Sequence, residues 1–158
     1  MKWLGVVAMG VWAVTAAVVI WFFVHGVTEP GADGRTKVLL APTERDLILG
    51  EMRQLLIGVD GIVGGLGDPD PTARQARVAK AARSVGMGMA ADVEPGLMAK
   101  LPLAFKQMGI SVHKDFDAMA DAAERGADPA DLLRSLASIT NRCTVCHALY
   151  QLPAAPAR

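Results

Sequence analysis

The sequence has no surplus of charge, few aromatic residues and almost no cysteine. Lysine and arginine together number 16, as do aspartate and glutamate, so the chain lacks the positive excess with which proteins meet nucleic-acid phosphates. Two cysteines cannot hold 158 residues together as a disulfide scaffold. Aromatic residues make up only 5%, which is low for a β-sandwich or barrel, whereas the abundant Ala, Leu, Met, Arg and Glu favour helices. The length suits one globular domain.

Charge is also missing from the segment Trp3–Val24, which is almost entirely apolar. As a helix rising ~1.5 Å per residue it would measure roughly 33 Å, enough to cross a hydrocarbon core of about 30 Å. A cleaved signal peptide would have a shorter apolar region followed by small residues, whereas bulky aromatic residues end this one. We therefore predict a single-pass transmembrane anchor over residues 1–25. Lys2 before the span, with Glu29 and Asp33 after it, favours a cytoplasmic N-terminus.

Proline, glycine and capping residues divide the rest of the chain into segments. Thr43 with Asp46 three residues later predicts a helix start, and Asp-Pro pairs predict two more. The predicted segments are a linker at 26–42, helices at 43–66, about 71–91, about 103–125 with a break at Gly109, and about 129–152, and a tail at 153–158. No stretch shows the alternation of apolar and polar residues that is typical of a β-strand. Short connections between amphipathic helices predict an all-α fold, an antiparallel four-helix bundle over 43–152.

The sequence Cys143-Thr-Val-Cys146-His147 has the C-x-x-C-H spacing of c-type haem attachment. On a helix the two thiols lie one turn apart and reach the two vinyl groups on one edge of a porphyrin, while the adjacent histidine supplies a nitrogen ligand to the iron. A zinc site would need two further ligands nearby, and the remaining histidines are His25 and His113. A thioredoxin-like dithiol would begin a helix after a strand. The motif therefore favours one covalent haem c.

The position of this motif near the C-terminus, followed by Tyr150 after three predicted helices, resembles the class II c-type cytochromes, the cytochrome c-prime family and its low-spin relatives. The resemblance covers about residues 43–152. It implies a four-helix bundle that holds one haem through Cys143 and Cys146, with His147 as the proximal ligand. Family members usually carry a basic residue after the tyrosine, where this chain has Gln151.

The sixth iron ligand would come from the first bundle helix, because in this family that helix lies over the open haem face. Low-spin members present a methionine there and transfer electrons, whereas high-spin members present an apolar residue and bind small gases. At 100° per residue an apolar arc contains the following residues: Ile48, Met52, Leu55, Leu56, Val59, Ile62, Val63 and Leu66. Met52 is therefore our predicted distal ligand, with Ile57 on the opposite side. The alternatives to Met52 are another methionine as the distal ligand and an iron whose sixth position is open.

Two further features need a structural explanation. His113 is the other histidine of the predicted domain, and a core-polar or capping role is favoured over iron ligation. Several glycines fall within the first predicted bundle helix, among them Gly50, Gly58, Gly61 and Gly64, although each mid-helix glycine costs up to ~1 kcal/mol relative to alanine. They indicate either close packing against a partner helix or subunit, or a frayed helix end.

The expected function is that of a membrane-anchored, mono-haem electron carrier rather than an enzyme by itself. Haem c is normally attached outside the cytoplasm, so the bacterial inner membrane with the haem domain in the periplasm is the expected location. The expected partners are redox proteins of the same membrane, and the chain could serve as a subunit of a respiratory, photosynthetic or dehydrogenase complex. The alternative function is that of a five-coordinate haem protein that binds or senses small gases. A third possible function is that of a docking subunit whose haem is incidental.

Overall fold

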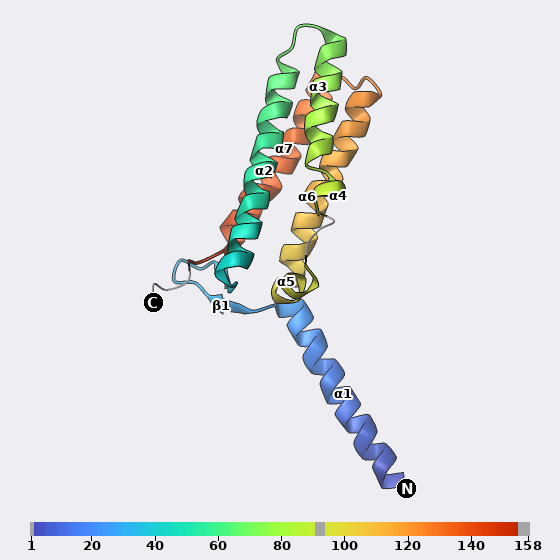
Figure 1. Cartoon of the computed structure of the whole chain (residues 1–158), viewed down its shortest axis with the longest axis vertical. Helices are drawn as coiled ribbons and strands as arrows, with labels where there is room; N and C mark the ends of the chain where they lie inside the picture. Colours follow the sequence, from blue (N-terminus) through green and yellow to red (C-terminus); the bar gives the residue numbers. More distant parts are fainter. Residues whose placement is uncertain (1, 91–93, 155–158) are drawn as a thin grey trace.

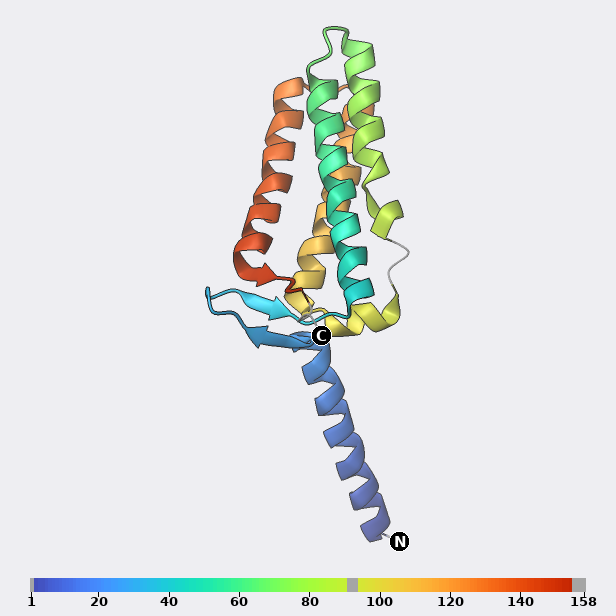
Figure 2. The ribbon, with the colours of Figure 1, turned by 60° about the vertical axis from the view of Figure 1, so that its left-hand side comes forward.

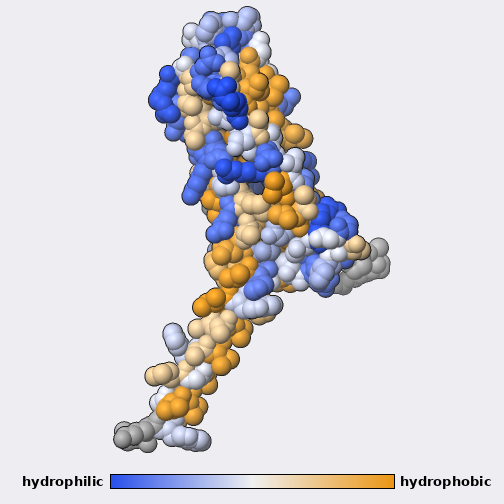
Figure 3. Space-filling model, turned by 180° about the vertical axis from the view of Figure 1, so that it is seen from behind, coloured by the Kyte–Doolittle hydropathy of each residue, from blue (hydrophilic) through white to orange (hydrophobic). Residues whose placement is uncertain are grey.

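The computed structural model describes residues 2–90 and 94–154, and it confirms a mostly helical chain with an apolar N-terminal helix. That helix, α1 (Lys2–His25), projects from one end of the molecule (Figures 1 and 2). The stretch Trp3–His25 lies outside the protein core and is long and apolar enough to cross a membrane. Apolar side chains predominate along it in Figure 3. Residues 155–158 of the predicted tail lie outside the described residues.

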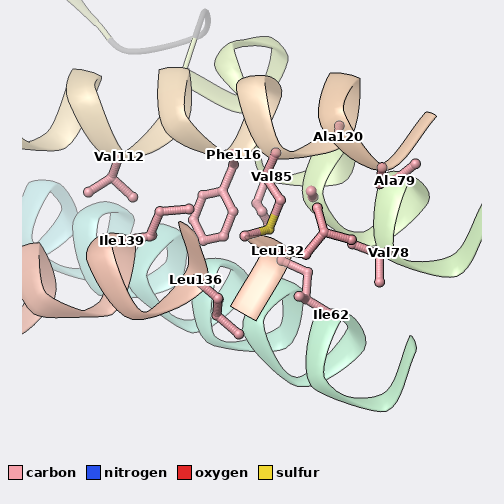
Figure 4. Packing of buried hydrophobic residues seen from close by; sticks show 13 residues of the cluster. Ile62, Val78, Ala79, Val85, Val112, Phe116, Ala120, Leu132, Leu136 and Ile139 are labelled. Atoms are coloured by element: carbon pink, nitrogen blue, oxygen red, sulfur yellow. The ribbon is translucent and has the colours of Figure 1, made fainter. Parts of the chain in front are cut away.

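Four long helices stand side by side beyond α1 (Figures 1 and 2). They are α2 (Pro42–Leu66), α3 (Pro71–Ser84), α6 (Leu103–Glu124) and α7 (Pro129–Leu149). α2 and α6 lead away from α1, and α3 and α7 return toward it. Their shared core includes Ile62, Phe116 and Leu132, each at most 1% exposed, with further apolar residues from all four helices around them (Figure 4).

Helices α3 and α7 start at the capping residues that the sequence predicted. Asp70 accepts a hydrogen bond from the Ala73 amide (2.9 Å) at the start of α3, and Asp128 caps α7 in the same way. The start of α2 differs from the prediction, because the carboxylate of Glu44 accepts a hydrogen bond from the Ala41 amide at 2.8 Å. The cap therefore lies two residues before Thr43, and Pro42 occupies the first turn.

Two predictions about helix interruptions are wrong. The predicted helix at about 71–91 ends at Ser84 and resumes as α4 (Met87–Ala90), because Gly86 lies tightly against the carboxylate of Asp117 and the Met87 amide donates to that carboxylate at 2.8 Å. Residues 91–93 lie outside the described chain. A short helix, α5 (Pro95–Lys100), follows, and α6 then continues without a break through Gly109.

The glycines of α2 bring that helix close to α3. A Cβ atom on Gly58 would lie 2.6 Å from a Val85 side-chain carbon, and one on Gly65 would lie 3.0 Å from the Val78 backbone nitrogen. A Cβ on Gly64 would meet nothing within 4 Å. Close packing against a partner helix is therefore the right explanation for Gly58 and Gly65, and the partner belongs to the same chain.

A three-stranded sheet lies at the α1 end of the four helices, where the sequence indicated a plain linker. β1 (Thr28–Pro30) pairs antiparallel with β2 (Thr36–Val38), and β2 pairs parallel with β3 (Tyr150–Gln151). Val38 is fully buried in a second apolar cluster with Ile48, Leu97, Leu101 and Phe105. This pairing corrects the expectation that the region before α2 lacks strands.

The end of α1 is fastened to the domain. Gly26 has a φ of +65°, and its close approach to the backbone of residues 100–102 leaves no room for a side chain. The Val27 amide donates to the Lys100 carbonyl at 2.8 Å, and the Lys106 ammonium donates to the Phe23 carbonyl at 3.0 Å. Helix α1 therefore continues directly into the fold.

Candidate cofactor site

The cysteines and histidine of the C-x-x-C-H motif occupy the last turns of α7, close to the end of the molecule from which α1 projects (Figures 1 and 2). Because α7 stays helical to Leu149, Cys143 and Cys146 lie about one turn apart. Both cysteines are free and half-buried, whereas His147 is exposed. Burial raises the pKa of both thiols, and the neighbouring Cys143 adds to the effect on Cys146. Both thiols therefore stay protonated near neutral pH.

A cavity of about 320 Å³ lies between α7 and α2 beside this motif. It is lined by Arg35, Leu49, Met52, Phe105, Cys146, His147, Tyr150, Gln151 and Leu152. The structure thus brings Met52 of α2 together with Cys146 and His147 of α7. Cys143 lies about one turn before Cys146 on α7 and is not among the lining residues.

The rotation of α2 decides which of its side chains reach this cavity. Ile57, which the prediction placed on the opposite side from Met52, is 61% exposed. Leu56 and Val63, which the predicted arc placed in the core, are instead 68% and 54% exposed. The reason is that α2 turns its glycines toward α3, which leaves Leu56 and Val63 on the face that also carries Met52.

Aromatic and charged side chains border the cavity below α7. The rings of Phe105 and Tyr150 meet edge to face, with centroids 5.3 Å apart. Arg35 pairs with Asp33 at 2.7 Å and donates to the His147 carbonyl at 3.5 Å. The hydrogen bonds from Arg35 lower the pKa of the Asp33 carboxyl. The cavity therefore combines an apolar wall with one guanidinium at its edge.

Sequence reasoning missed four of the lining residues, which are Arg35, Leu49, Phe105 and Leu152. Leu49 precedes Met52 by three positions and shares its face of α2, so helical spacing contains the signal for it. Arg35 reaches the cavity because the loop between β1 and β2 is held beside β3 by the pairing of Thr36 with Tyr150. No local pattern in the sequence encodes that contact.

His113 lies outside this cavity and has a core-polar role. It is 2% exposed, its Nδ1 lies 2.8 Å from the Val85 carbonyl oxygen, and its Nε2 lies 2.9 Å from Glu51 Oε1. Burial opposes a charge on this imidazole, but the hydrogen bonds to Glu51 and Val85 outweigh it and raise its pKa. The expectation of a satisfied polar group in the core is therefore met.

The rival uses of the motif find less support in the structure. A zinc site would need more ligands, but His25 stacks on Trp21 at the end of α1 and His113 is engaged by Glu51 and Val85. Within residues 2–90 and 94–154 there is no group of three or more His, Cys, Asp or Glu side chains that could hold a metal ion. A thioredoxin-like dithiol would begin a helix, whereas these cysteines lie near the end of one.

Comparisons of the chain with protein-family models, curated proteins and solved structures found no match.

Proposed function

We propose that this protein is a membrane-anchored, mono-haem c-type cytochrome of class II that transfers electrons. The observation that carries the proposal is the cavity between α2 and α7, where Met52 stands together with Cys146 and His147. A thioether sulfur and an imidazole nitrogen form an axial pair that c-type cytochromes use for electron transfer. Neither residue has another hydrogen-bonded or ionic partner for its sulfur or ring within the described part of the chain.

The chemistry of the donor set agrees with a covalent haem. Two free thiols one helical turn apart are followed directly by an exposed imidazole, which gives two attachment points and a ligand on one helix end. The exposed Leu56 lies about one turn beyond Met52 on the same face of α2 and offers apolar surface that a porphyrin would cover. The residues present therefore fit the group.

Each residue has a defined task in this proposal. Cys143 and Cys146 tether the haem, and His147 and Met52 hold the iron. Phe105 and Tyr150 keep water from the lower side of the cavity, and Arg35 supplies positive charge at its edge. When bound, the haem supplies one-electron chemistry, whose potential the axial ligands and burial would set.

The anchor restricts where the electrons come from and where they go. We place the N-terminus in the cytoplasm and the haem domain in the periplasm of a bacterial inner membrane, since haem c is attached outside the cytoplasm and Lys2 precedes the span. Because α1 continues into the fold through Gly26 and Val27, the domain stays close to the bilayer. Redox proteins of the same membrane, including a respiratory, photosynthetic or dehydrogenase complex, are the proposed partners.

One observation favours a second candidate, a five-coordinate gas-binding haem protein. Leu49 lines the same cavity as Met52, and a leucine over the iron would leave the sixth position open. The two functions therefore differ in which α2 side chain faces the iron.

Replacing Met52 separates the two functions. Met52→Leu keeps the volume nearly constant, so we expect a folded, haem-loaded protein whose ferric iron changes from low to high spin and whose ferrous form gains affinity for carbon monoxide. The measurement is the absorption spectrum of the full chain in detergent, with and without carbon monoxide.

Ile57→Ala is the matched control on the same helix, because Ile57 is exposed on the outer side of α2. Its spectrum should equal that of the unmodified protein. A high-spin, carbon monoxide-binding spectrum in the unmodified protein would instead support the gas-binding candidate.

A further inference from the structure

A larger cavity, of about 580 Å³, lies on the other side of α2, among α2, α4, α5 and α6. Most of its walls are apolar and come from leucine, isoleucine and methionine side chains such as Leu47, Leu97 and Met98. Four ionisable side chains interrupt the apolar lining: Asp46, Glu51, Lys106 and His113. Lys106 and His113 are only 6% and 2% exposed. An apolar cavity with a few convergent polar groups is the usual form of a small-molecule site.

The cavity adjoins the end of the membrane anchor. Lys106, which lines it, donates to the Phe23 carbonyl at 3.0 Å, and its ammonium lies 3.8 Å from the centre of the Phe23 ring. Met98 on α5 lines the same cavity, and α5 is tied to α1 through the hydrogen bond from Val27 to Lys100. With α1 in a bilayer, the cavity lies at the membrane surface, where a lipid-soluble molecule is available.

The cavity also borders the proposed haem site. Phe105 of α6 lines both cavities, so its ring forms a wall common to them. On α2, the adjacent residues Ile48 and Leu49 line the larger and the smaller cavity respectively. A molecule bound in the larger cavity would therefore be separated from the haem site by about one side chain.

We propose that the larger cavity binds the head group of a membrane quinone or quinol. This inference rests on the proposed function, because it supplies the lipid-soluble redox partner of the haem site. A lipid acyl chain would need only the apolar walls, whereas a hydroquinone hydroxyl can donate to the carboxylate of Glu51, and a quinone carbonyl can accept from a cationic side chain. Glu51 already holds His113 through Oε1, so the acceptor is fixed in position.

The direct test is photolabelling of the full chain in lipid nanodiscs with an azido-benzoquinone that carries a decyl tail. We expect saturable labelling of peptides from residues 94–110. An excess of the decyl-benzoquinone that lacks the azide should reduce this labelling at least tenfold. Labelling confined to α1, labelling that does not saturate, or labelling that added phospholipid suppresses and the quinone does not would each overturn the inference.

Gly109 offers a way to fill the cavity without disturbing its walls. It lines the cavity, and a Cβ atom built on it would meet no atom of the described residues within 4 Å. Gly109→Leu should therefore fold and reduce the specific labelling at least tenfold. Gly64→Leu is the matched control, because Gly64 is a helical glycine with equal free space but lies away from the cavity, and it should leave labelling unchanged.

A second variant tests the polar contact without filling the cavity. Glu51→Gln keeps a hydrogen-bonding oxygen for His113 but removes the negative charge, so the concentration of decyl-benzoquinol needed for half-protection should rise at least threefold. The inference is overturned if Gly109→Leu leaves the specific labelling unchanged and Glu51→Gln leaves the half-protecting concentration of decyl-benzoquinol unchanged.

The haem content of the same samples keeps this test separate from the proposed function. A haem-loaded, low-spin protein without specific labelling would contradict the quinone site and leave the cytochrome proposal standing. Specific, Gly109-dependent labelling of a chain that never acquires haem would contradict the cytochrome proposal while upholding the cavity as a quinone site.

Discussion

The two ends of the four long helices differ in how they are packed. Away from α1, α2 approaches α3 through Gly58 and Gly65, and the core around Ile62, Phe116 and Leu132 is almost fully buried. Near α1, the second apolar cluster borders the 320 Å³ and 580 Å³ cavities, and both cysteines and the buried Lys106 lie in that half. The comparison indicates that one end stabilises the fold while the other leaves space for ligands.

The prediction with the largest expected effect concerns the haem that we propose for the loosely packed end. Replacing Cys143 and Cys146 by alanine removes both attachment points, so haem staining of the chain on a denaturing gel should disappear altogether. The close-packed end contains neither residue, so the helix content measured by circular dichroism should persist.

Thr144→Ala is the control for this experiment. Thr144 lies between the two cysteines and is exposed, and its hydroxyl donates to the carbonyl of Asn141 on the preceding turn at 2.8 Å. Its haem staining should match that of the unmodified chain. Persistent covalent haem in the double variant would refute the assignment of the site.

A smaller effect tests the close-packed end. Gly58→Ala puts a methyl group 2.6 Å from the Val85 side chain, so we expect the free energy of unfolding to fall by about 1–3 kcal/mol. Gly64→Ala should raise it by about 0.5 kcal/mol, because the new methyl meets open space and alanine favours the helix. Chemical denaturation of the full chain in detergent measures both.

If Gly58→Ala is as stable as Gly64→Ala, then α2 does not rely on close approach to α3 at that position. The difference between the two packing regions would then have to come from the large apolar side chains alone.

The smallest effect concerns the His113–Glu51 pair, which stands between the two regions. The pKa of His113 is raised in the fold above its ordinary value of 6.5. The charged pair therefore adds its full contribution to the free energy of unfolding below pH 6.5. This contribution is lost as the pH rises through the pKa of His113 in the folded protein. Glu51→Gln should therefore lower the free energy of unfolding by about 1 kcal/mol more at pH 6 than at pH 9. If Glu51→Gln lowers the free energy of unfolding equally at pH 6 and pH 9, His113 and Glu51 do not form a charged pair.

Features encoded by short stretches of sequence could be predicted. The uninterrupted apolar run predicted α1, and Asp70 and Asp128 predicted the starts of α3 and α7. Met52 was located by helical phase, and the structure brings it into one cavity with Cys146 and His147. The predictions of α1 and of the two helix starts are confirmed because hydrophobic runs and caps act within a few turns, whereas the role of Met52 as an iron ligand stays a prediction.

Features that depend on distant segments could not be predicted. The strands β2 and β3 are three and two residues long. The pairing of Thr36 with Tyr150 joins two segments that are far apart in the sequence of the domain. Leu56 and Val63 are exposed because glycines turn another face of α2 toward α3, which an apolar count along one helix does not reveal. Gly109 was expected to interrupt α6, but a glycine in open space is tolerated within a helix.

The most direct test of the central claim is near-infrared magnetic circular dichroism of the ferric full chain in detergent, since this spectrum reports the axial ligands of a haem. Our account predicts the low-spin signature of one sulfur and one nitrogen ligand, from Met52 and His147. A high-spin spectrum, or the signature of two nitrogen ligands, would contradict it.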